Sequence, residues 1–342
     1  MAGGEITSIK GIAEACGLSY STVSRVLNGK SYVKEETRQK VMAVVKENNF
    51  HPNILAKSLK EGSNRTICLM IPSYGNLIFP LVMRGVDNIA RKHNYSVIFS
   101  VTDERPAVEQ ATYDQMLNRQ VAGFIICSAI GNEDAIYHMH DEGVPIVLIN
   151  RFKKDDIGKI DTVSIDSYQV GYDATRYLLN TGRSRIAICI GDESLFLYQE
   201  RYRGYCAALR DAGIEVDEKL VLHQPATGQP GFKDLIIQMY RNSIRPDAIF
   251  ATSDPIAFIV IHALHNLHVA IPSETAVISI DNVSLSQYIE PPLTTINQPL
   301  IEMGAVATNQ LLRQIEYKKK HGILPTPETS FLDYDLIVRQ ST

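Results

Sequence analysis

The stretch LSYSTVSRVLNG, residues 18–29, decides how the first part of the chain folds, and it is an unusual sequence for a helix. Seven of its first eight residues are β-branched, hydroxyl-bearing or basic rather than strong helix formers. Val23, Val26 and Leu27 nevertheless follow the i, i+3, i+4 spacing of a buried helix face. We therefore predict a short helix that is capped by Ser19, ends at Gly29 and presents polar residues to solvent.

The segment before this stretch predicts another short helix, over residues 9–16. Thr7 or Ser8 can cap its start, and Gly17 can form the left-handed turn at its end. Two short helices joined by a turn that contains glycine are typical of a helix-turn-helix, whose second helix enters the major groove of DNA. A third amphipathic helix is predicted over residues 35–48, so the head is expected to be all-α.

The polar face of the second helix has side chains suited to DNA. Short hydroxyls approach phosphates closely, and the guanidinium of Arg25 can bind O6 and N7 of guanine together. The alternative is a solvated helix face without a partner. Charge favours DNA, because residues 1–60 hold nine Lys and Arg against five Glu, whereas the whole chain has a net charge of −4.

Length and composition indicate a multidomain protein that stays inside the cell. The 342 residues suggest two or three domains. Neither a charged and apolar leader nor an apolar run of about 18 residues is found, so we expect a cytoplasmic protein. The five cysteines are far apart and mostly within apolar runs, which predicts buried, reduced thiols.

From residue 66 onward, short β-rich runs alternate with amphipathic segments, which is typical of parallel sheets buried on both faces. The rhythm occurs twice and breaks near residues 162–166, so we expect two Rossmann-like subdomains. The predicted strands are TICLMIP (66–72), YSVIFSV (95–101), GFIICSA (123–129), PIVLIN (145–150), RIAICIG (185–191), DAIFATS (247–253) and AVISID (276–281).

Polar residues gather at the carboxyl ends of these strands, where open parallel sheets bind ligands. Two facing sheets would form a cleft, and mixed donors and acceptors with a few apolar walls suit a small polar ligand such as a sugar. Each residue alone has an alternative structural role. The strand ends are residues 73–79, Asn150 and Arg151, 191–201, Ser253 and Asp254, Asp281 and Asn282, and Gln298.

The head resembles the DNA-binding domain of the lactose/galactose repressor family almost residue for residue, through VSRVLNG (23–29), TRQKV (37–41) and FHPNILAKSLK (50–60). Lys34 departs from the small capping residue usual there. The resemblance implies that Tyr20 and Ser21 read variable bases, Arg25 a guanine, and that Leu59 wedges into DNA from a hinge helix; an ordinary linker is the alternative. The residues expected at DNA are Thr7, Ser19, Tyr20, Ser21, Thr22, Ser24, Arg25, Asn28, Asn53, Ala56 and Leu59.

The body resembles the effector domain of the same repressors, itself similar to periplasmic sugar-binding proteins, through VPIVLINR (144–151), ERYRGYCAAL (200–209), AIFATSD (248–254), PPLTTINQP (291–299) and FLDYDLIVRQST (331–342). The resemblance implies that Arg201 and Asp281 are the main effector ligands. Asn150 stands where the family commonly has Asp, NLIF (76–79) replaces Asn-Pro-Phe-Phe, and SID (279–281) replaces Gly-aromatic-Asp. The expected effector-binding residues are Ile78, Phe79, Asn150, Leu195, Arg201, Ser253, Asp281 and Gln298.

These observations predict an α/β protein with a helix-turn-helix head and a two-lobed body like that of periplasmic binding proteins. The expected divisions are a DNA-binding domain over residues 1–52, a hinge helix and linker over 53–64, and an effector-binding and dimerisation domain over 65–342. Within this last domain, an N-subdomain is expected over about 65–162 and 294–323, and a C-subdomain over about 163–293 and 324–342.

Sequence motifs of catalysis and metal binding are missing. The spacing of His262, His265 and His268 spreads them around a helix instead of bringing them together as metal ligands. Neither G-x-S-x-G nor a phosphate-binding glycine loop occurs. We therefore expect no enzyme activity, cofactor or metal, but a repressor that binds a pseudo-palindromic operator as a dimer and responds to a sugar-like effector. The alternative is a cytoplasmic enzyme or carrier with an accessory helical head.

Overall fold

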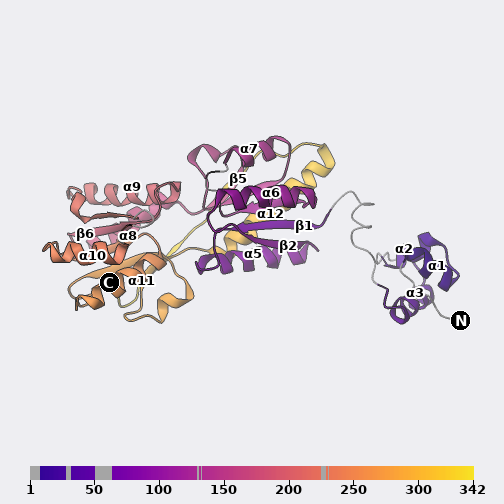
Figure 1. Cartoon of the computed structure of the whole chain (residues 1–342), viewed down its shortest axis with the longest axis horizontal. Coiled ribbons are helices and arrows are strands. Elements are labelled where there is room, and N and C mark those ends of the chain that lie inside the picture. Colours follow the sequence, from indigo (N-terminus) through magenta and orange to yellow (C-terminus); the bar gives the residue numbers. More distant parts are fainter. Residues whose placement is uncertain are drawn as a thin grey trace. The chain divides into compact units, whose positions relative to one another are not determined.

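The computed structural model describes residues 8–27, 32–50, 64–128, 131, 133–224, 229 and 231–342. The chain forms two compact units, Met1–Asn64 and Arg65–Thr342, which we call the head and the body (Figure 1). In the described residues, no helix combines the length and the apolar character that crossing a membrane requires.

The described part of the head has three helices, α1 (Ile9–Cys16), α2 (Tyr20–Leu27) and α3 (Glu35–Glu47). Of the two predicted caps of α1, Ser8 lies within the described residues, and its hydroxyl accepts a hydrogen bond from the Gly11 amide at 3.1 Å. Gly17 ends α1 in the left-handed region, with φ 63°. The helices enclose a small apolar core of Ile12, Ala13, Cys16, Val23, Val26, Val41 and Phe50.

The body contains two sheets of six strands each. The sheet of the N-subdomain is parallel throughout, in the order β11 (Thr329–Phe331), β5 (Asp161–Ser164), β4 (Ile146–Ile149), β3 (Gly123–Ile126), β1 (Thr66–Ile71) and β2 (Ser96–Val101). The sheet of the C-subdomain has the order β12 (Asp335–Ile337), β10 (Thr294–Asn297), β9 (Ala276–Asp281), β8 (Ala248–Ala251), β6 (Ile186–Ile190) and β7 (Val221–His223), and only β12 is antiparallel. All seven predicted strands are confirmed.

Helices cover both faces of each sheet, which explains why the strands are almost entirely apolar. In the N-subdomain, Leu69 and its alternate neighbours pack against α5 (Ile78–Lys92) and α12 (Leu300–His321). Cys68 and Met70 pack toward α6 (Pro106–Asn118) and α7 (Glu133–Asp141). In Figure 1, α6 and α7 lie on one side of β1 and α5 lies on the other. The C-subdomain sheet lies between α8 (Ser167–Asn180) with α9 (Phe196–Asp211) and α10 (Phe232–Arg241) with α11 (Asp254–Asn266). Three short 3₁₀ helices, Lys154–Asp156, Glu218–Leu220 and Ser284–Gln287, lie in loops.

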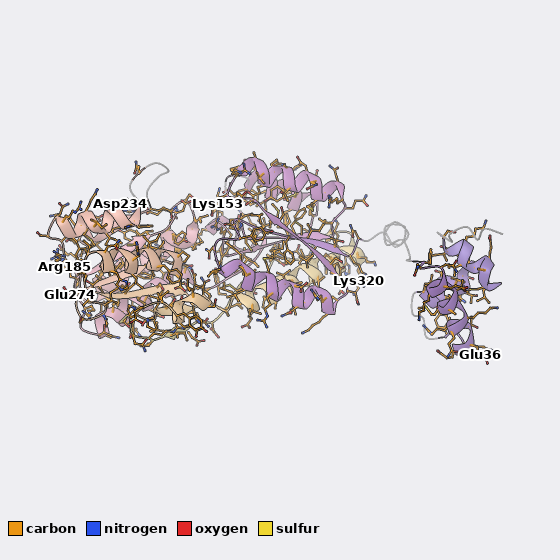
Figure 2. All side chains as sticks on the ribbon, turned by 60° about the horizontal axis from the view of Figure 1, so that its bottom comes forward. Glu36, Lys153, Arg185, Asp234, Glu274 and Lys320 are labelled. Atoms are coloured by element: carbon orange, nitrogen blue, oxygen red, sulfur yellow. The ribbon has the colours of Figure 1, made fainter. Side chains whose placement is uncertain are left out.

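Charged side chains lie on the outside of these layers. Asp234 on α10, Glu274 before β9 and Lys320 near the end of α12 are all exposed at the surface of the body (Figure 2). All five cysteines are unpaired; four are buried and Cys206 is half-buried. The predicted burial of the cysteines is therefore confirmed for four of the five.

Pairs of glycines allow two helix pairs to approach backbone to backbone. A Cβ atom at Gly85 of α5 would lie 2.0 Å from the Ile301 carbonyl oxygen of α12, and one at Gly304 would lie 2.3 Å from the Val82 carbonyl oxygen. Gly171 of α8 and Gly204 of α9 form the corresponding contact in the C-subdomain. The second contact fixes α9, whose first turns carry several residues of the cavity described below.

The chain crosses between the subdomains at other points than those predicted. β10 (Thr294–Asn297) belongs to the C-subdomain sheet beside β9, although the sequence interpretation placed residues from 294 in the N-subdomain. β11 (Thr329–Phe331) pairs with β5 of the N-subdomain, not with the C-subdomain. Strands of three or four residues show too little alternation to indicate their sheet. The crossovers lie at residues 165–166, 298–299 and 332–334.

Candidate functional sites

The outward face of α2 is formed by residues that the sequence interpretation assigned to DNA. Tyr20 is 46% exposed, and Ser19, Ser21 and Arg25 are also exposed, whereas Val23 and Val26 are buried in the head core. The face is continuous because its members lie at helical spacing on the side opposite the valines. It can therefore meet another surface without disturbing the core.

Hydroxyl contacts at the start of α2 fix the geometry of this face. The Ser19 hydroxyl accepts a hydrogen bond from the Thr22 amide at 3.2 Å and contacts the hydroxyls of Ser21 (2.9 Å) and Thr22 (2.8 Å). Ser19 thus satisfies a helix-end amide, as its sequence position suggested. Thr22 and Ser24 are half-buried and lie at the edges of the exposed face.

An aromatic residue that sequence reasoning missed lies beside Arg25. The guanidinium carbon of Arg25 is 5.7 Å from the centre of the Tyr32 ring, a cation–π contact, and Tyr32 is 68% exposed. The contact limits the directions that the Arg25 side chain explores. The available signal was an aromatic residue three positions after Gly29, where the sequence predicted the end of this helix.

Five of the predicted DNA-binding residues lie outside the described residues, and their roles stay predictions. They are Thr7, Asn28, Asn53, Ala56 and Leu59.

In the body, a cavity lies between the two subdomains at the carboxyl ends of their strands. The residues that line it come from the start of α5, the ends of β3, β4 and β9, the first turns of α9 and the crossover before α12. They are Asn76, Ile78, Phe79, Val82, Cys127, Ile149, Asn150, Arg151, Leu197, Tyr198, Arg201, Asp281 and Gln298. Six predicted effector residues are among them: Ile78, Phe79, Asn150, Arg201, Asp281 and Gln298.

Gln298 connects the two subdomains through hydrogen bonds. Its Nε2 donates to Oδ1 of Asp281 at 2.6 Å, and its Oε1 accepts from Nδ2 of Asn150 at 3.3 Å. Asn150 Oδ1 in turn accepts from the Ser164 hydroxyl at 3.0 Å. A polar chain therefore runs from β9 of one sheet, through a crossover residue, to β4 and β5 of the other.

Arg201 of α9 is held by a backbone carbonyl after β8 and by an aromatic ring one turn earlier on α9. It is 3% exposed, its Nη1 donates to the Thr252 carbonyl at 2.6 Å, and its guanidinium lies 5.4 Å from the Tyr198 ring centre. The Tyr198 ring packs directly on Gly191, because a Cβ atom there would lie 2.5 Å from the ring. Burial lowers the pKa of Arg201, and the negative charge of Asp281 opposes this effect.

Asp281 is a buried carboxyl group beside another carboxylate. Its pKa is raised to about 7 by burial and by the negative charge of Asp254, while Arg201 acts in the opposite direction. Its Oδ2 accepts from the Asp254 amide at 3.3 Å, so both of its oxygens have partners within the protein. The Asp254 carboxylate is satisfied separately by the hydroxyls of Ser279, Ser286 and Thr295 and by the Val283 amide.

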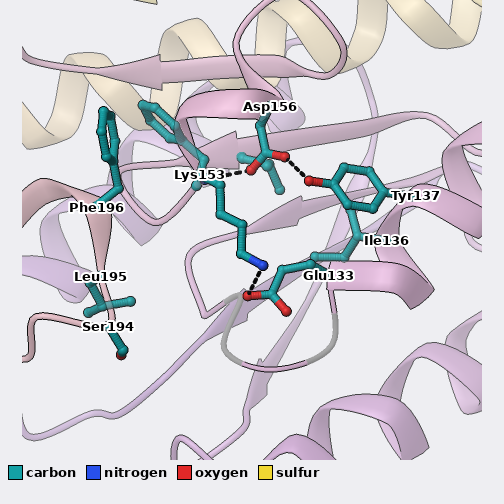
Figure 3. A pocket seen from close by; sticks show the side chains of 10 residues that line it. Glu133, Ile136, Tyr137, Lys153, Asp156, Ser194, Leu195 and Phe196 are labelled. Carbon is teal, nitrogen blue, oxygen red and sulfur yellow. Dashed lines mark hydrogen bonds and ion pairs between the residues drawn. The ribbon is translucent and has the colours of Figure 1, made fainter.

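Two predicted effector residues do not line this cavity. Leu195 directly precedes α9 and lines a second cavity together with Phe196. Lys153 and Glu133, which form an ion pair at 3.2 Å, line another side of this second cavity (Figure 3). Ser253 lies next to the Tyr198 hydroxyl, and Tyr198 is the residue that lines the cavity there. Both residues belong to the strand-end segments 191–201 and 253–254 named in the sequence, but the direction of each side chain depends on the local loop geometry.

Tyr198 and Arg151 are the main residues that the resemblance did not supply. Both lie within the strand-end segments that sequence analysis singled out, so position was the available signal. Among the described residues, no group of three His, Cys, Asp or Glu side chains is arranged to hold a metal ion.

Comparison with known proteins gives the same two-part organisation. Residues 8–53 match the model "Bacterial regulatory proteins, lacI family", and residues 64–327 match "Periplasmic binding proteins and sugar binding domain of LacI family". The HTH-type transcriptional regulator DegA of Bacillus subtilis (strain 168) is 31% identical over 339 residues, which is 98% of each chain.

Solved structures share the fold over nearly the whole chain. A complex of the transcriptional regulator CelR with cellobiose has a TM-score of 0.74 and 25% identity, covering 98% of this chain and 99% of that one. The lac repressor dimer bound to operator and the anti-inducer ONPF has a TM-score of 0.84 and 23% identity over 98% of both chains, which shows a common fold. The chain belongs to the LacI family of bacterial regulatory proteins and is a DNA-binding transcription regulator, not an enzyme.

Proposed function

We propose that this regulator is a repressor whose dimer binds a pseudo-palindromic operator and is controlled by a small polar effector in the cavity between the subdomains. A sugar or sugar derivative is the effector class that the cavity favours. Amide, guanidinium and carboxyl groups surround apolar walls there, a combination that suits paired hydroxyl groups. The relative CelR was solved with cellobiose, which supports the same class.

The observation that carries this proposal is the polar chain through Gln298. Its members belong to both subdomains, so a ligand that contacts Asp281, Gln298 and Asn150 contacts both sheets at once. A ligand shifts a conformational equilibrium only by its difference in affinity for the two states. Contacts to both subdomains provide such a difference, because their relative pose changes the fit.

On the DNA side, we propose that α2 is the recognition helix. Tyr20, Ser21 and Arg25 form its outward face, and Arg25 is the predicted reader of a guanine. We infer that the protein acts in the cytoplasm, where a bacterial regulator meets its DNA.

Fluorescence anisotropy with a pool of labelled genomic fragments tests the proposal. The full chain should select fragments with two-fold symmetric half-sites, and one member of a sugar panel should change the affinity. Selection without any two-fold pattern would contradict the dimer model. Absence of fragment selection, with and without each sugar, would overturn the proposed operator binding.

A further inference from the structure

The effector cavity carries an excess of positive groups. Its charged lining residues, within the part of the chain that the structure describes, are Arg151, Arg201 and Asp281. Asp281 already accepts hydrogen bonds on both oxygens from Gln298 and from the Asp254 amide. The one carboxyl group that lines the cavity in the described residues therefore has a protein partner on each oxygen, whereas each of the two guanidinium groups keeps one nitrogen without a hydrogen-bond partner.

Arg151 is placed in the cavity by a tight backbone turn after β4. Its amide donates to the Ile149 carbonyl at 2.6 Å, and Asn150 between them has φ 59°. Nη2 of Arg151 pairs with Glu104 at 2.9 Å at the outer side, where Glu104 is half-exposed. Nη1 is buried and has no hydrogen-bond partner among the described residues.

Arg201 shows the same feature from the other subdomain. Its Nη1 is used by the Thr252 carbonyl, but its buried Nε has no partner among the residues that the structure describes. Leaving a buried donor unpaired costs roughly 1–3 kcal/mol, and more for a charged group. Two such donors, on two arginines that line the same cavity, favour a ligand that supplies acceptors.

We propose that the effector carries an oxyanion, a carboxylate or a phosphate, on a small polyhydroxylated skeleton, and that Arg151 and Arg201 bind this anionic group. The inference rests on the function proposed above. An oxyanion matches the planar fork of a guanidinium and makes stronger hydrogen bonds than a neutral hydroxyl. The amides of Asn76, Asn150 and Gln298 remain suited to the hydroxyl groups of the skeleton.

Matched pairs of probes test the charge requirement. Thermal unfolding and titration calorimetry of the full chain would compare D-glucose with D-gluconate and D-glucose 6-phosphate, and D-galactose with D-galacturonate and D-galactose 6-phosphate. At least one anionic compound should bind about tenfold or more tightly than its neutral partner. The carboxylate and phosphate arms distinguish the two sources of the anion. Equal or tighter binding of the neutral partners, or no binding by any anionic compound, would overturn the inference.

Three variants connect this preference to the arginine. Arg151→Gln should weaken the anionic compound about tenfold or more and change its neutral partner less than about twofold. Glu104→Gln removes a competing negative charge and should strengthen anion binding, which provides a test even if Arg151→Gln folds poorly. Arg241→Gln, at an exposed position on α10, is the matched control and should change neither affinity. An unchanged anion preference in both Arg151→Gln and Glu104→Gln would contradict the assignment.

Operator binding, measured separately by anisotropy, distinguishes this inference from the function on which it rests. A neutral sugar that binds the cavity at least as tightly as its anionic partners and changes operator affinity would leave the regulator proposal intact and overturn the anionic effector. An anionic compound that binds through Arg151, in a protein that selects no operator fragment, would support the anionic ligand and contradict the proposed operator binding.

Discussion

At the scale of single residues, Asp281 makes the stability of the body depend on pH. Its folded pKa of about 7 lies above its usual value of 3.8, because burial and Asp254 disfavour the charge. A carboxyl group with a raised folded pKa contributes stability that is complete below the unfolded pKa and is lost as pH rises through the folded pKa. Stability should therefore fall from about pH 4 to about pH 7 and change little above that.

The Asp281→Asn variant should reduce this fall by about 1 kcal/mol or more, since one pKa unit corresponds to about 1.4 kcal/mol. The measurement is urea unfolding of the full chain at several pH values. The exposed Asp234→Asn change on α10 is the control and should leave the slope as it is. An unchanged slope in Asp281→Asn would show that this carboxyl group is not the source.

Arg25 should determine sequence-specific DNA binding. It is exposed on the outward face of α2 and lies against the Tyr32 ring. Replacing it with alanine should cost about 1–3 kcal/mol in specific affinity and change non-specific affinity by much less. Anisotropy with the selected operator and with a scrambled fragment measures both. Equal losses on the two fragments would assign Arg25 to the phosphate backbone instead.

Single residues also show where sequence reasoning succeeds and where it stops. Arg201 and Asp281 could be named because strand ends and family resemblance both indicate them, and they do line the cavity. Leu195 does not line this cavity, because the direction of a side chain just before a helix depends on the loop geometry, which the sequence does not show. The partners of Gln298 in both subdomains lie far apart in sequence and follow only from the crossover geometry.

At the scale of elements, the glycine contact between α5 and α12 should control the stability of the N-subdomain. A methyl group at Gly85 would lie 2.0 Å from the Ile301 carbonyl oxygen, so the helices must separate. Gly85→Ala should lower the free energy of unfolding by about 3 kcal/mol, at the upper end of overpacking costs. Urea unfolding measures it. Gly231→Ala, where open space surrounds the added atom, is the matched control. If both variants lowered the free energy of unfolding by the same small amount, the close contact between α5 and α12 would not limit stability.

The predictability of strands followed their apolar composition, since β3, β4 and β8 were also identified although they have only four residues each. Strands such as β1 and β9 have six residues each and are apolar enough to identify. β10, β11 and β12 have three or four residues, and their assignment to a sheet depends on pairing with distant strands. The first two helices of the head were predictable because Ser8 and Gly17 mark the ends of α1 and Ser19 marks the start of α2.

At the scale of the whole molecule, effector and operator binding should be coupled reciprocally. If the effector weakens operator binding by a given factor, the operator complex must bind the effector more weakly by the same factor. Calorimetry of the effector with free protein and with the operator complex, compared with anisotropy at saturating effector, measures the two factors. Unequal factors would mean that a third equilibrium, such as dimer dissociation, takes part.

Gln298 should transmit part of this coupling, because it lies on a crossover and bonds to Asp281 on one side and Asn150 on the other. Gln298→Ala removes both contacts while the remaining crossovers, at residues 165–166 and 332–334, stay unchanged. The coupling factor should fall about fivefold or more, a loss within the usual range of allosteric coupling energies. The comparison must be made at effector saturation, so that weaker effector binding alone does not lower the observed response. A Gln298→Ala protein that binds effector more weakly but keeps the full coupling factor would show that other contacts between the subdomains carry the signal.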